Sequence, residues 1–427
     1  MKKVRIAFYG NICNNLYQIA KALRQSADAD AHLFIDSAAD PQQLPESDDP
    51  ELADNYPAWI HKRRFLNVFS LLLPWLSHLA RELRTFDFIV VSGNGPIFAQ
   101  FSGRPFAFLT AGADLTVLPF PLQSLRSYPT VKLKLFGLLA GFWQRRAIRR
   151  STEIWTQPFY PFLNPLKRLG VPAGRISPAY FPVIIDADRV RYNPAARQSN
   201  LQAMKDIVSR DPDFVLFHPA RMFIRMSPKI VETGRFKGND ILIRGFAEFV
   251  SRKVVKRPLL VLIDRDVSGD VDLARQLIRS LGIEEYVYWA KGPRRFGFTR
   301  DELTDLYSVS DVVADDFSVG WFGSIVLEGL AVERPVISFV DERAMSQMYA
   351  WHPILSSKTE RGIADFLSRL ATDVSFRTQQ GRLGRRWILE YHSHGAAAGR
   401  YVTNVNDGIQ RTVGVRVPFE RAQKDAT

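Results

Sequence analysis

The chain has 427 residues, enough for two or three domains. Hydrophobic residues make up 46% and charged residues 24%, which excludes a disordered, collagen-like or low-complexity chain. The single cysteine, Cys13, excludes an intrachain disulfide and a cysteine-built zinc cage. The net charge of +13 leaves nucleic acid, anionic lipid and phosphorylated small molecules as partner classes to consider.

This charge is distributed unevenly. Ala27–Asn55 holds nine acidic residues and neither Lys nor Arg, whereas Val131–Arg150 holds six basic residues and no acidic one. His61–Arg84 is also basic, with apolar residues in between. The longest apolar stretch, Phe65–Ala80, is short for a transmembrane span. Since the N-terminal run is typical of a first strand rather than a signal peptide, we expect a cytoplasmic protein, which can be peripheral to the inner face of the membrane.

The N-terminal half alternates between apolar runs and helical patterns. The predicted strands are Val4–Tyr9, Ala31–Ile35, Phe88–Val91, Phe106–Leu109 and Glu153–Thr156. The predicted helices are Leu16–Arg24, Val131–Arg150 and Phe162–Leu169. Such alternation predicts a parallel sheet covered by helices. The polar, aperiodic segment Ile185–Asn200 then marks a domain boundary.

A second alternation follows this boundary. Its predicted strands are Phe214–Phe217, Leu259–Ile263, Tyr286–Trp289, Val312–Ala314 and Val336–Phe339. Its predicted helices are Asp240–Val250, Val271–Leu281, Arg300–Ser308, Ser324–Ala331, Arg361–Leu370 and Ser375–Tyr391. We therefore expect an α/β protein with two Rossmann-like, doubly wound domains that face each other across a cleft. The expected domains are residues 1–190 and 191–395, and residues 396–427 form a C-terminal tail that can pack back on the first domain.

The most informative segment follows the strand Val312–Ala314. Gly323 and Ser324 open the next helix, where backbone N–H groups and the helix dipole favour a bound phosphate. Glu328 lies four residues after Ser324, on the same helix face. A carboxylate there can accept hydrogen bonds from two ribose hydroxyls. The alternative is a plain strand–loop–helix with Glu328 in solvent.

The stretch from Gly320 to Ile337 resembles a known donor-site signature, E-x-F-G-x-x-x-L-E-A-x-A-x-G-x-P-V-I, of family-4-type glycosyltransferases with the GT-B fold. The matching residues are Phe322, Gly323, Leu327, Glu328, Ala331, Pro335, Val336 and Ile337. Gly320 stands where the signature has its first glutamate, which in such enzymes lies near the transferred sugar. Asp315-Asp316 takes the place of an Asp-Gln pair found in a similar subgroup.

A second segment supports the resemblance. His218–Phe223 and Phe236–Ala247 are similar to the pattern G-R-x…K-G-x-x-x-L-I-x-A-F of the same enzymes. The resemblance implies that Arg221 and Lys237 neutralise a nucleotide diphosphate. Fixed cations stabilise such a leaving group because it gains negative charge in the transition state. The resemblance also implies that these cations act without a metal ion or cofactor. Taken alone, the two residues could be surface charges.

Two loops of the N-terminal half follow strands and so lie at carboxyl ends. Similar enzymes place the loop after the first strand near the acceptor or the donor phosphates, which makes Gly10 and Asn11 candidates. Asp114 could orient or deprotonate an acceptor hydroxyl, and its surroundings resemble a G-x-D-L turn of the same subgroup. The alternatives are a plain turn for the first loop and a loop cap for Asp114.

These observations predict a glycosyltransferase. It would move a sugar from a nucleoside-diphosphate-sugar donor to a hydroxyl of a glycan or lipid-linked glycan precursor, with retention implied by the resemblance. The expected catalytic residues are Asp114, Arg221 and Lys237. The expected residues for binding the nucleotide-sugar are Gly10, Asn11, Arg221, Lys237, Phe322, Gly323, Ser324 and Glu328.

Three alternatives stay open. The first is a catalytically silent protein of the same fold that binds nucleotide-sugar or membrane, which Gly320 favours. The second is an epimerase of similar fold. The third, nucleic-acid binding, is disfavoured because the sequence shows no recognition module. The helix Val131–Arg150 either docks on anionic lipid or faces the core.

Overall fold

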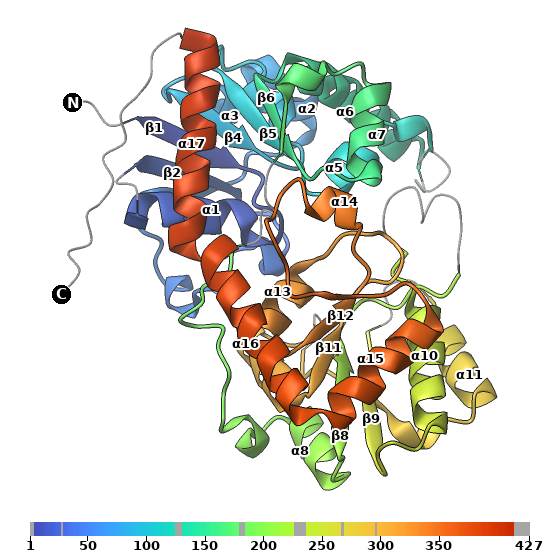
Figure 1. Ribbon diagram of the computed structural model, residues 1–427. Helices are drawn as coiled ribbons and strands as arrows, with labels where there is room; N and C mark the ends of the chain where they lie inside the picture. The colour runs from blue at the N-terminus through green and yellow to red at the C-terminus, as the bar shows by residue number, and fades with distance from the viewer. Residues whose placement is uncertain are drawn as a thin grey trace, which may run out of the picture. The chain divides into compact units, whose positions relative to one another are not determined.

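The computed structural model describes residues 4–26, 29–123, 130–178, 184–225, 236–265, 269–294 and 297–413. The chain forms two compact units. Unit 1 is Met1–Ile184 with His394–Thr427, and unit 2 is Ile185–Ser393. Each unit has a parallel sheet flanked by helices (Figure 1), which confirms the predicted α/β class. Residues 414–427 of the expected tail lie outside the described residues.

The described residues of unit 1 form seven parallel strands in the order β3-β2-β1-β4-β5-β6-β7. Their bounds are β1 (Arg5–Tyr9), β2 (Asp30–Asp36), β3 (Ile60–Arg63), β4 (Phe88–Val91), β5 (Phe106–Leu109), β6 (Glu153–Thr156) and β7 (Ile176–Pro178). The five predicted strands are present. The two outer strands, β3 and β7, were not predicted, because neither contains a continuous apolar run; three of the four residues of β3 are at least partly exposed.

Helices cover both faces of this sheet. Those of unit 1 are α1 (Asn15–Ser26), α2 (Val68–Leu72), α3 (His78–Leu83), α4 (Gly95–Ala99), α5 (Ala113–Thr116), α6 (Val131–Arg150), α7 (Tyr160–Arg168) and α17 (His394–Val413). The helix α6 has the predicted bounds, and its start is fixed by Thr130, whose side chain accepts a hydrogen bond from the N–H of Leu133.

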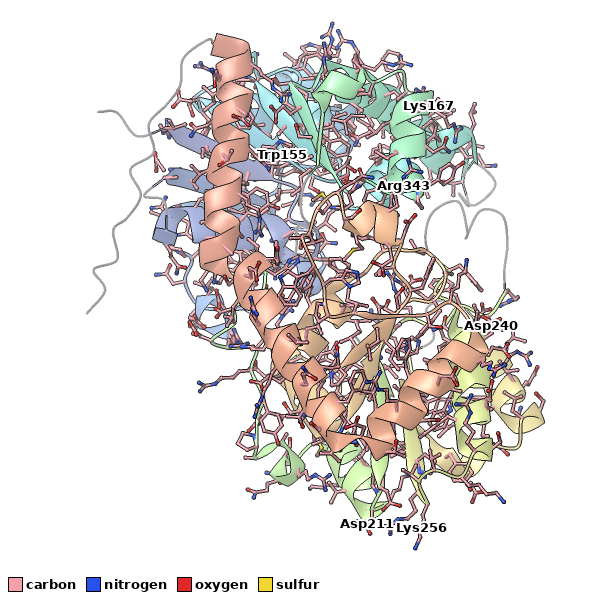
Figure 2. The ribbon with its side chains drawn as sticks, in the orientation of Figure 1. Trp155, Lys167, Asp211, Asp240, Lys256 and Arg343 are labelled. Atoms are coloured by element: carbon pink, nitrogen blue, oxygen red, sulfur yellow. The ribbon has the colours of Figure 1, made fainter. Side chains whose placement is uncertain are left out.

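The last helix, α17, joins unit 1 although it follows unit 2 in sequence. Its buried residues recur every three or four positions and belong to the same core cluster as α1 and the sheet: Ala397, Ala398, Tyr401, Val405 and Ile409. The Tyr401 ring lies 5.9 Å from that of Trp155 on β6, which Figure 2 labels beside this helix. Arg411 pairs with the buried Glu153 at 3.4 Å.

In unit 2, the part of the chain that the structure describes forms six parallel strands in the order β10-β9-β8-β11-β12-β13. They are β8 (Phe214–His218), β9 (Pro258–Ile263), β10 (Val287–Ala290), β11 (Val312–Ala314), β12 (Val336–Ser338) and β13 (Leu355–Ser356). The main helices are α8 (Gln202–Ser209), α10 (Asn239–Ser251), α11 (Val271–Ser280), α12 (Arg300–Val309), α13 (Ser324–Ala331), α14 (Glu342–Met345), α15 (Glu360–Thr372) and α16 (Val374–Tyr391). All strands predicted here are present, and among the described residues of this unit the two-residue β13 is the one additional strand.

Each sheet reverses its strand order at its first strand. In unit 1, β1 lies between β2 and β4; in unit 2, β8 lies between β9 and β11. The connections on either side of such a point run to opposite faces of the sheet, which leaves a crevice beyond the carboxyl ends of the two central strands. The fold therefore provides one potential binding position in each unit.

Candidate functional site

In unit 2, the loops after β8 and β11 bring a lysine and two aspartates together. Asp315 and Asp316 directly follow β11, and Lys237 precedes α10. The Lys237 Nζ lies 2.9 Å from Asp316 Oδ2 and 3.9 Å from Asp315 Oδ1. The neighbouring carboxylates raise the pKa of Lys237 to about 12 although burial acts in the opposite direction. Lys237 is thus a fixed cation, already balanced by acidic side chains.

Asp315 lies at the start of α13, where we expected a phosphate. Its Oδ2 accepts a hydrogen bond from the N–H of Gly323, the residue that caps this helix, at 3.2 Å. Burial raises the pKa of Asp315, while Lys237 lowers it. A carboxylate therefore uses one of the backbone donors predicted for the nucleotide, and Ser324 follows, half-buried, as the first helical residue.

A second polar network holds the loop that carries Arg221. The His218 Nδ1 donates to the Ala314 carbonyl at 2.9 Å, and its Nε2 accepts from the Asn239 amide at 2.8 Å. Burial lowers the pKa of His218 to about 4, so the ring is neutral at pH 7. Asn239 also donates to the backbone oxygen of Arg221, whose side chain is exposed. The roles of His218 and Asn239 were not predicted from the sequence, because they depend on contacts between different strands and helices.

Glu328 is buried rather than in solvent. Its Oε1 accepts a hydrogen bond from Arg300 at 2.5 Å, and its Oε2 accepts one from the Tyr307 hydroxyl at 2.9 Å. Both partners come from α12, and the Tyr307 ring packs on Phe217 of β8. Each carboxylate oxygen has further lone pairs, so a carboxylate fixed in this way can still accept ribose hydroxyls. Arg300 and Tyr307 were not predicted from the sequence, because no short motif connects them to Glu328.

Gly320, where the signature has glutamate, adopts a left-handed backbone conformation with φ of 79°. A Cβ here would lie 3.3 Å from the ring of Phe339 and 3.4 Å from the Cβ of Asp341. The Gly320 carbonyl also accepts a hydrogen bond from the Asp341 N–H. Because residues with a Cβ are strained in this conformation, the local backbone favours glycine.

Phe322, another predicted binding residue, has a buried side chain in an aromatic cluster. Its ring lies 5.2 Å from Trp321, 5.6 Å from Trp387 and 6.0 Å from Tyr349. The ring therefore supports the loop before Gly323 from the core side, and a ligand contact from Phe322 would have to come from its backbone.

Unit 1 has a cavity of about 530 Å³ at its own reversal point. It is lined by residues at or after the carboxyl ends of β1, β2 and β4 and by residues of α5 and the segment after it, including Gly10, Asn11, Asp36, Gly93, Asp114 and Leu118. The three unit-1 residues predicted for the site, Gly10, Asn11 and Asp114, thus line one cavity. Gly10 has φ of 95°, and a Cβ there would lie 2.0 Å from the Ser92 carbonyl oxygen, so only glycine fits.

Asp114 is the buried acid of this cavity. Its carboxylate accepts hydrogen bonds from the backbone N–H of Gly93 at 3.0 Å and of Ala111 at 3.1 Å. Burial raises its pKa to about 6, although these backbone donors act in the opposite direction. Asp114 therefore fastens two loops, as the loop-cap alternative requires, and burial keeps its pKa above the usual range of a carboxyl group.

Asn11 lines the cavity, but its side chain is engaged within the loop. Its amide donates to Asn14 Oδ1 at 2.7 Å and to the Gln43 carbonyl at 2.8 Å, and its Oδ1 accepts from the Tyr17 N–H. Both amide hydrogens are thus committed. The main role visible for Asn11 is to shape the loop that follows Gly10.

The described part of the chain shows neither a metal-binding cluster nor a membrane-spanning helix. Its His, Cys, Asp and Glu side chains include no group of three or more that could hold a metal ion. None of its helices combines the length and the apolar character that crossing a bilayer requires.

Comparison with known proteins identifies the fold of the chain. No family model matches the chain. Over 107 residues, 24% of each chain, it is 35% identical to D-inositol 3-phosphate glycosyltransferase of Corynebacterium aurimucosum. Over 180 residues, it is 30% identical to the enzyme of the same name from Rhodococcus erythropolis. The second match covers 36% of this chain and 39% of that enzyme, so both matches span well under half of the relatives' length.

A solved structure matches over nearly the whole length. HepE from Anabaena, in complex with UDP-glucose, superposes with a TM-score of 0.63 at 16% identity, covering 94% of this chain and 99% of that one. The chain therefore has the GT-B fold, and the expected resemblance to glycosyltransferases of this fold is confirmed.

Proposed function

We propose that the protein is a glycosyltransferase that uses a nucleoside-diphosphate-sugar donor. The observation that supports this most is in unit 2, where Arg221 follows β8, Lys237 pairs with the two aspartates that follow β11, and Glu328 lies on the next helix, α13. Two cations suit a diphosphate, and a fixed carboxylate suits a ribose. HepE, which shares the fold, was solved with UDP-glucose, which makes uridine nucleotides the first donors to try.

In this proposal the bond between the sugar C1 and the diphosphate oxygen breaks, and a bond from C1 to the acceptor oxygen forms. Lys237 and Arg221 stabilise the charge that develops on the leaving diphosphate. Asp114, in the unit 1 cavity, orients the acceptor hydroxyl and takes its proton. We propose retention of configuration from the resemblance, and an acceptor hydroxyl on a glycan or lipid-linked glycan precursor.

The test is release of nucleoside diphosphate from a panel of uridine, guanosine and adenosine diphosphate sugars, with a bacterial lipid extract as the acceptor source. We expect release from one base class, and loss of at least about 100-fold in Lys237→Met, which removes the charge that the transition state needs. Lys21→Met is the matched control, because Lys21 also pairs with a buried aspartate, Asp49, at 2.7 Å, but in unit 1. Equal rates in the two variants would contradict the role of Lys237.

The second candidate is a catalytically silent protein that binds nucleotide-sugar. Gly320 favours it, because the position of the usual glutamate has a backbone that specifies glycine. Asp315 also favours it, since its carboxylate uses a backbone donor of α13. Nucleotide binding without any release of diphosphate, across the whole donor panel, would establish this alternative.

A further inference from the structure

The described part of unit 1 exposes an unusual concentration of large apolar side chains. Ten of the seventeen that are exposed among the described residues come from α2, α6, two short connecting helices, η5 (Pro74–Leu76) and η6 (Pro121–Gln123), and Leu73, which joins α2 to η5. They are Phe69, Leu72, Leu73, Trp75, Leu76, Leu122, Val131, Leu133, Leu135 and Phe142, which we call the α2–α6 surface. Contiguous exposed apolar patches mark protein or membrane interaction sites.

The elements of this surface are packed together. The helix α2 contacts both α6 and η5, and η6 contacts α6; α2 and α6 lie side by side in Figure 1. The Trp75 ring lies 5.9 Å from that of Trp143, which in turn lies 5.0 Å from that of Phe142. Gly141 allows Pro121 to pack directly against α6, since a Cβ there would lie 2.6 Å from the proline ring.

The outward face of α6 is apolar along most of its length. Val131, Leu135 and Phe142 are spaced by four and seven residues, which places them on one helix face, and all three are exposed. On the opposite face, Ala140, Gln144 and Ala147 are buried in unit 1, whereas Leu133, near the start of the helix, is exposed. The helix therefore covers the core and also presents a second apolar stripe, so the two alternatives expected for it from sequence are compatible.

The charges around this surface are almost all positive. His61–Arg84 contains five Lys and Arg residues and one acid, Glu82, and α6 contains six basic residues and no acid. Arg64, Arg81 and Arg84 are exposed in the described structure. A bilayer with anionic lipids combines the apolar interior and negative surface that such a face requires, and tryptophan side chains prefer its interface.

We infer that the α2–α6 surface docks on an anionic bilayer and thereby presents the unit 1 cavity to an acceptor anchored in that bilayer. Leu66, in the cavity wall, immediately precedes the Asn67 cap of α2, and Leu118, also in the wall, has its carbonyl oxygen against Gly141 of α6. The acceptor class is then an amphiphile with its hydroxyl at the lipid–water interface. This second part rests on the proposed function; the docking surface does not.

The test is co-sedimentation with vesicles of phosphatidylcholine alone and of phosphatidylcholine mixed with phosphatidylglycerol, at low and high salt. We expect binding to the mixed vesicles only, weakened by salt. The side chains of Leu76 and Leu135 are 61% and 63% exposed. In the double variant Leu76→Gln, Leu135→Gln, the affinity for mixed vesicles should fall by about tenfold or more. The control is Val208→Gln with Leu389→Gln, which changes exposed apolar residues of unit 2.

Three outcomes would overturn the inference. The first is that the wild-type protein does not bind mixed vesicles, and the second is that both double variants lose the same share of vesicle binding. The third is that the protein does not bind vesicles but forms a dimer, and that this dimer dissociates in the variant Leu76→Gln, Leu135→Gln. That result would assign the surface to a second copy of the chain. Thermal unfolding with nucleotides on the same samples separates the two proposals. A nucleotide effect without vesicle binding overturns only the docking surface, and vesicle binding without a nucleotide effect overturns only the proposed function.

Discussion

At the scale of single residues, the chain differs from the glycosyltransferase subgroup that it resembles in the charges around Lys237. Asp316 stands where that subgroup has glutamine, and its carboxylate pairs with the lysine expected to hold a diphosphate. Its other oxygen, Oδ1, accepts hydrogen bonds from the N–H groups of Ser318 and Val319 at 2.8 Å. One residue thus both shapes the loop and reduces the positive charge of the site.

Asp316→Asn separates these two roles. Asparagine keeps an oxygen for the two backbone donors but removes one of the two negative charges beside Lys237. We expect the affinity for a nucleoside diphosphate to rise about tenfold, measured by titration calorimetry at pH 7. Asp311→Asn is the control, because Asp311 also accepts a backbone N–H, that of Val215, but at the opposite end of β11. Weaker binding by Asp316→Asn would show that Asp316 helps to hold the ligand.

Asp114 gives a pH dependence with a definite sign. Burial raises its pKa to about 6, so the carboxylate that can accept a proton predominates above that pH. We expect kcat/KM to fall as the pH is lowered through about 6 and to be constant between about 7 and 8 for this group. Asp114→Asn should lower kcat/KM and remove this limb. A limb that persists in Asp114→Asn would belong to another group.

At the scale of elements, α17 shows how a C-terminal segment becomes part of an N-terminal core. Gly408 is buried where the helix crosses Phe88 of β4, and a Cβ there would lie 2.6 Å from the phenyl ring. The same helix has an exposed glycine, Gly399, around which a Cβ would meet nothing within 4 Å. The two glycines therefore separate packing from helix propensity within one element.

We expect Gly399→Ala to stabilise the protein by up to about 1 kcal/mol, because alanine favours the helix. Gly408→Ala gains the same propensity but must displace the Phe88 ring from a filled core, which costs about 1–3 kcal/mol. Urea unfolding of the two variants, followed through a probe in unit 1, measures the difference. A Gly408→Ala protein as stable as Gly399→Ala would mean that α17 is not held against β4.

A second element is the loop from Ser318 to Phe322, which contains Gly320. A substitution at Gly320 tests whether this loop can hold the glutamate of the signature. Restoring the signature by Gly320→Glu should lower the free energy of unfolding by about 1–2 kcal/mol, because φ of 79° is strained for glutamate. We also expect no gain in donor turnover. Chemical unfolding together with the diphosphate-release assay measures both. A stable variant with higher turnover would show that the loop accepts the usual glutamate.

Elements whose interactions are local in sequence could be predicted from the sequence, whereas elements that depend on tertiary packing could not. Buried strands such as Phe88–Val91 were predicted because the apolar run is continuous, and α6 because its pattern and cap are local. The helix α17 was not predicted as a helix, since Gly395, Gly399 and Gly408 weaken its intrinsic propensity and tertiary packing compensates.

In the candidate site, too, some residues could be predicted from the sequence and their interaction partners could not. Lys237, Gly323 and Glu328 could be chosen from short motifs, and Gly10, Asn11 and Asp114 from their positions after strands. Their partners could not, because Arg300 lies 28 residues from Glu328 in sequence and His218 lies 21 residues from Asn239. Only the folded chain brings these pairs together.

At the scale of the whole molecule, the two units share one plan but differ in what their reversal points contain. Unit 2 has fixed charges, with Lys237 between aspartates and Glu328 held by Arg300. Unit 1 has a cavity of about 530 Å³, with Asp114 as its buried acid, and the apolar α2–α6 surface beside it. This division suits a charged nucleotide in one unit and an acceptor in the other.

The most direct test of this account is thermal unfolding with UDP, GDP, ADP and CMP in turn, on wild type, Glu328→Gln and Glu153→Gln. Both variants alter a buried carboxylate that pairs with arginine, but Glu153 belongs to unit 1, where it contacts Arg411 and Trp155. A ligand at about 100 times its Kd adds about 2.7 kcal/mol of stability. We predict that one nucleotide raises the Tm of wild type and Glu153→Gln by a few degrees but leaves Glu328→Gln unchanged. No rise with any nucleotide, or an equal rise in all three proteins, would contradict the assignment of the donor site.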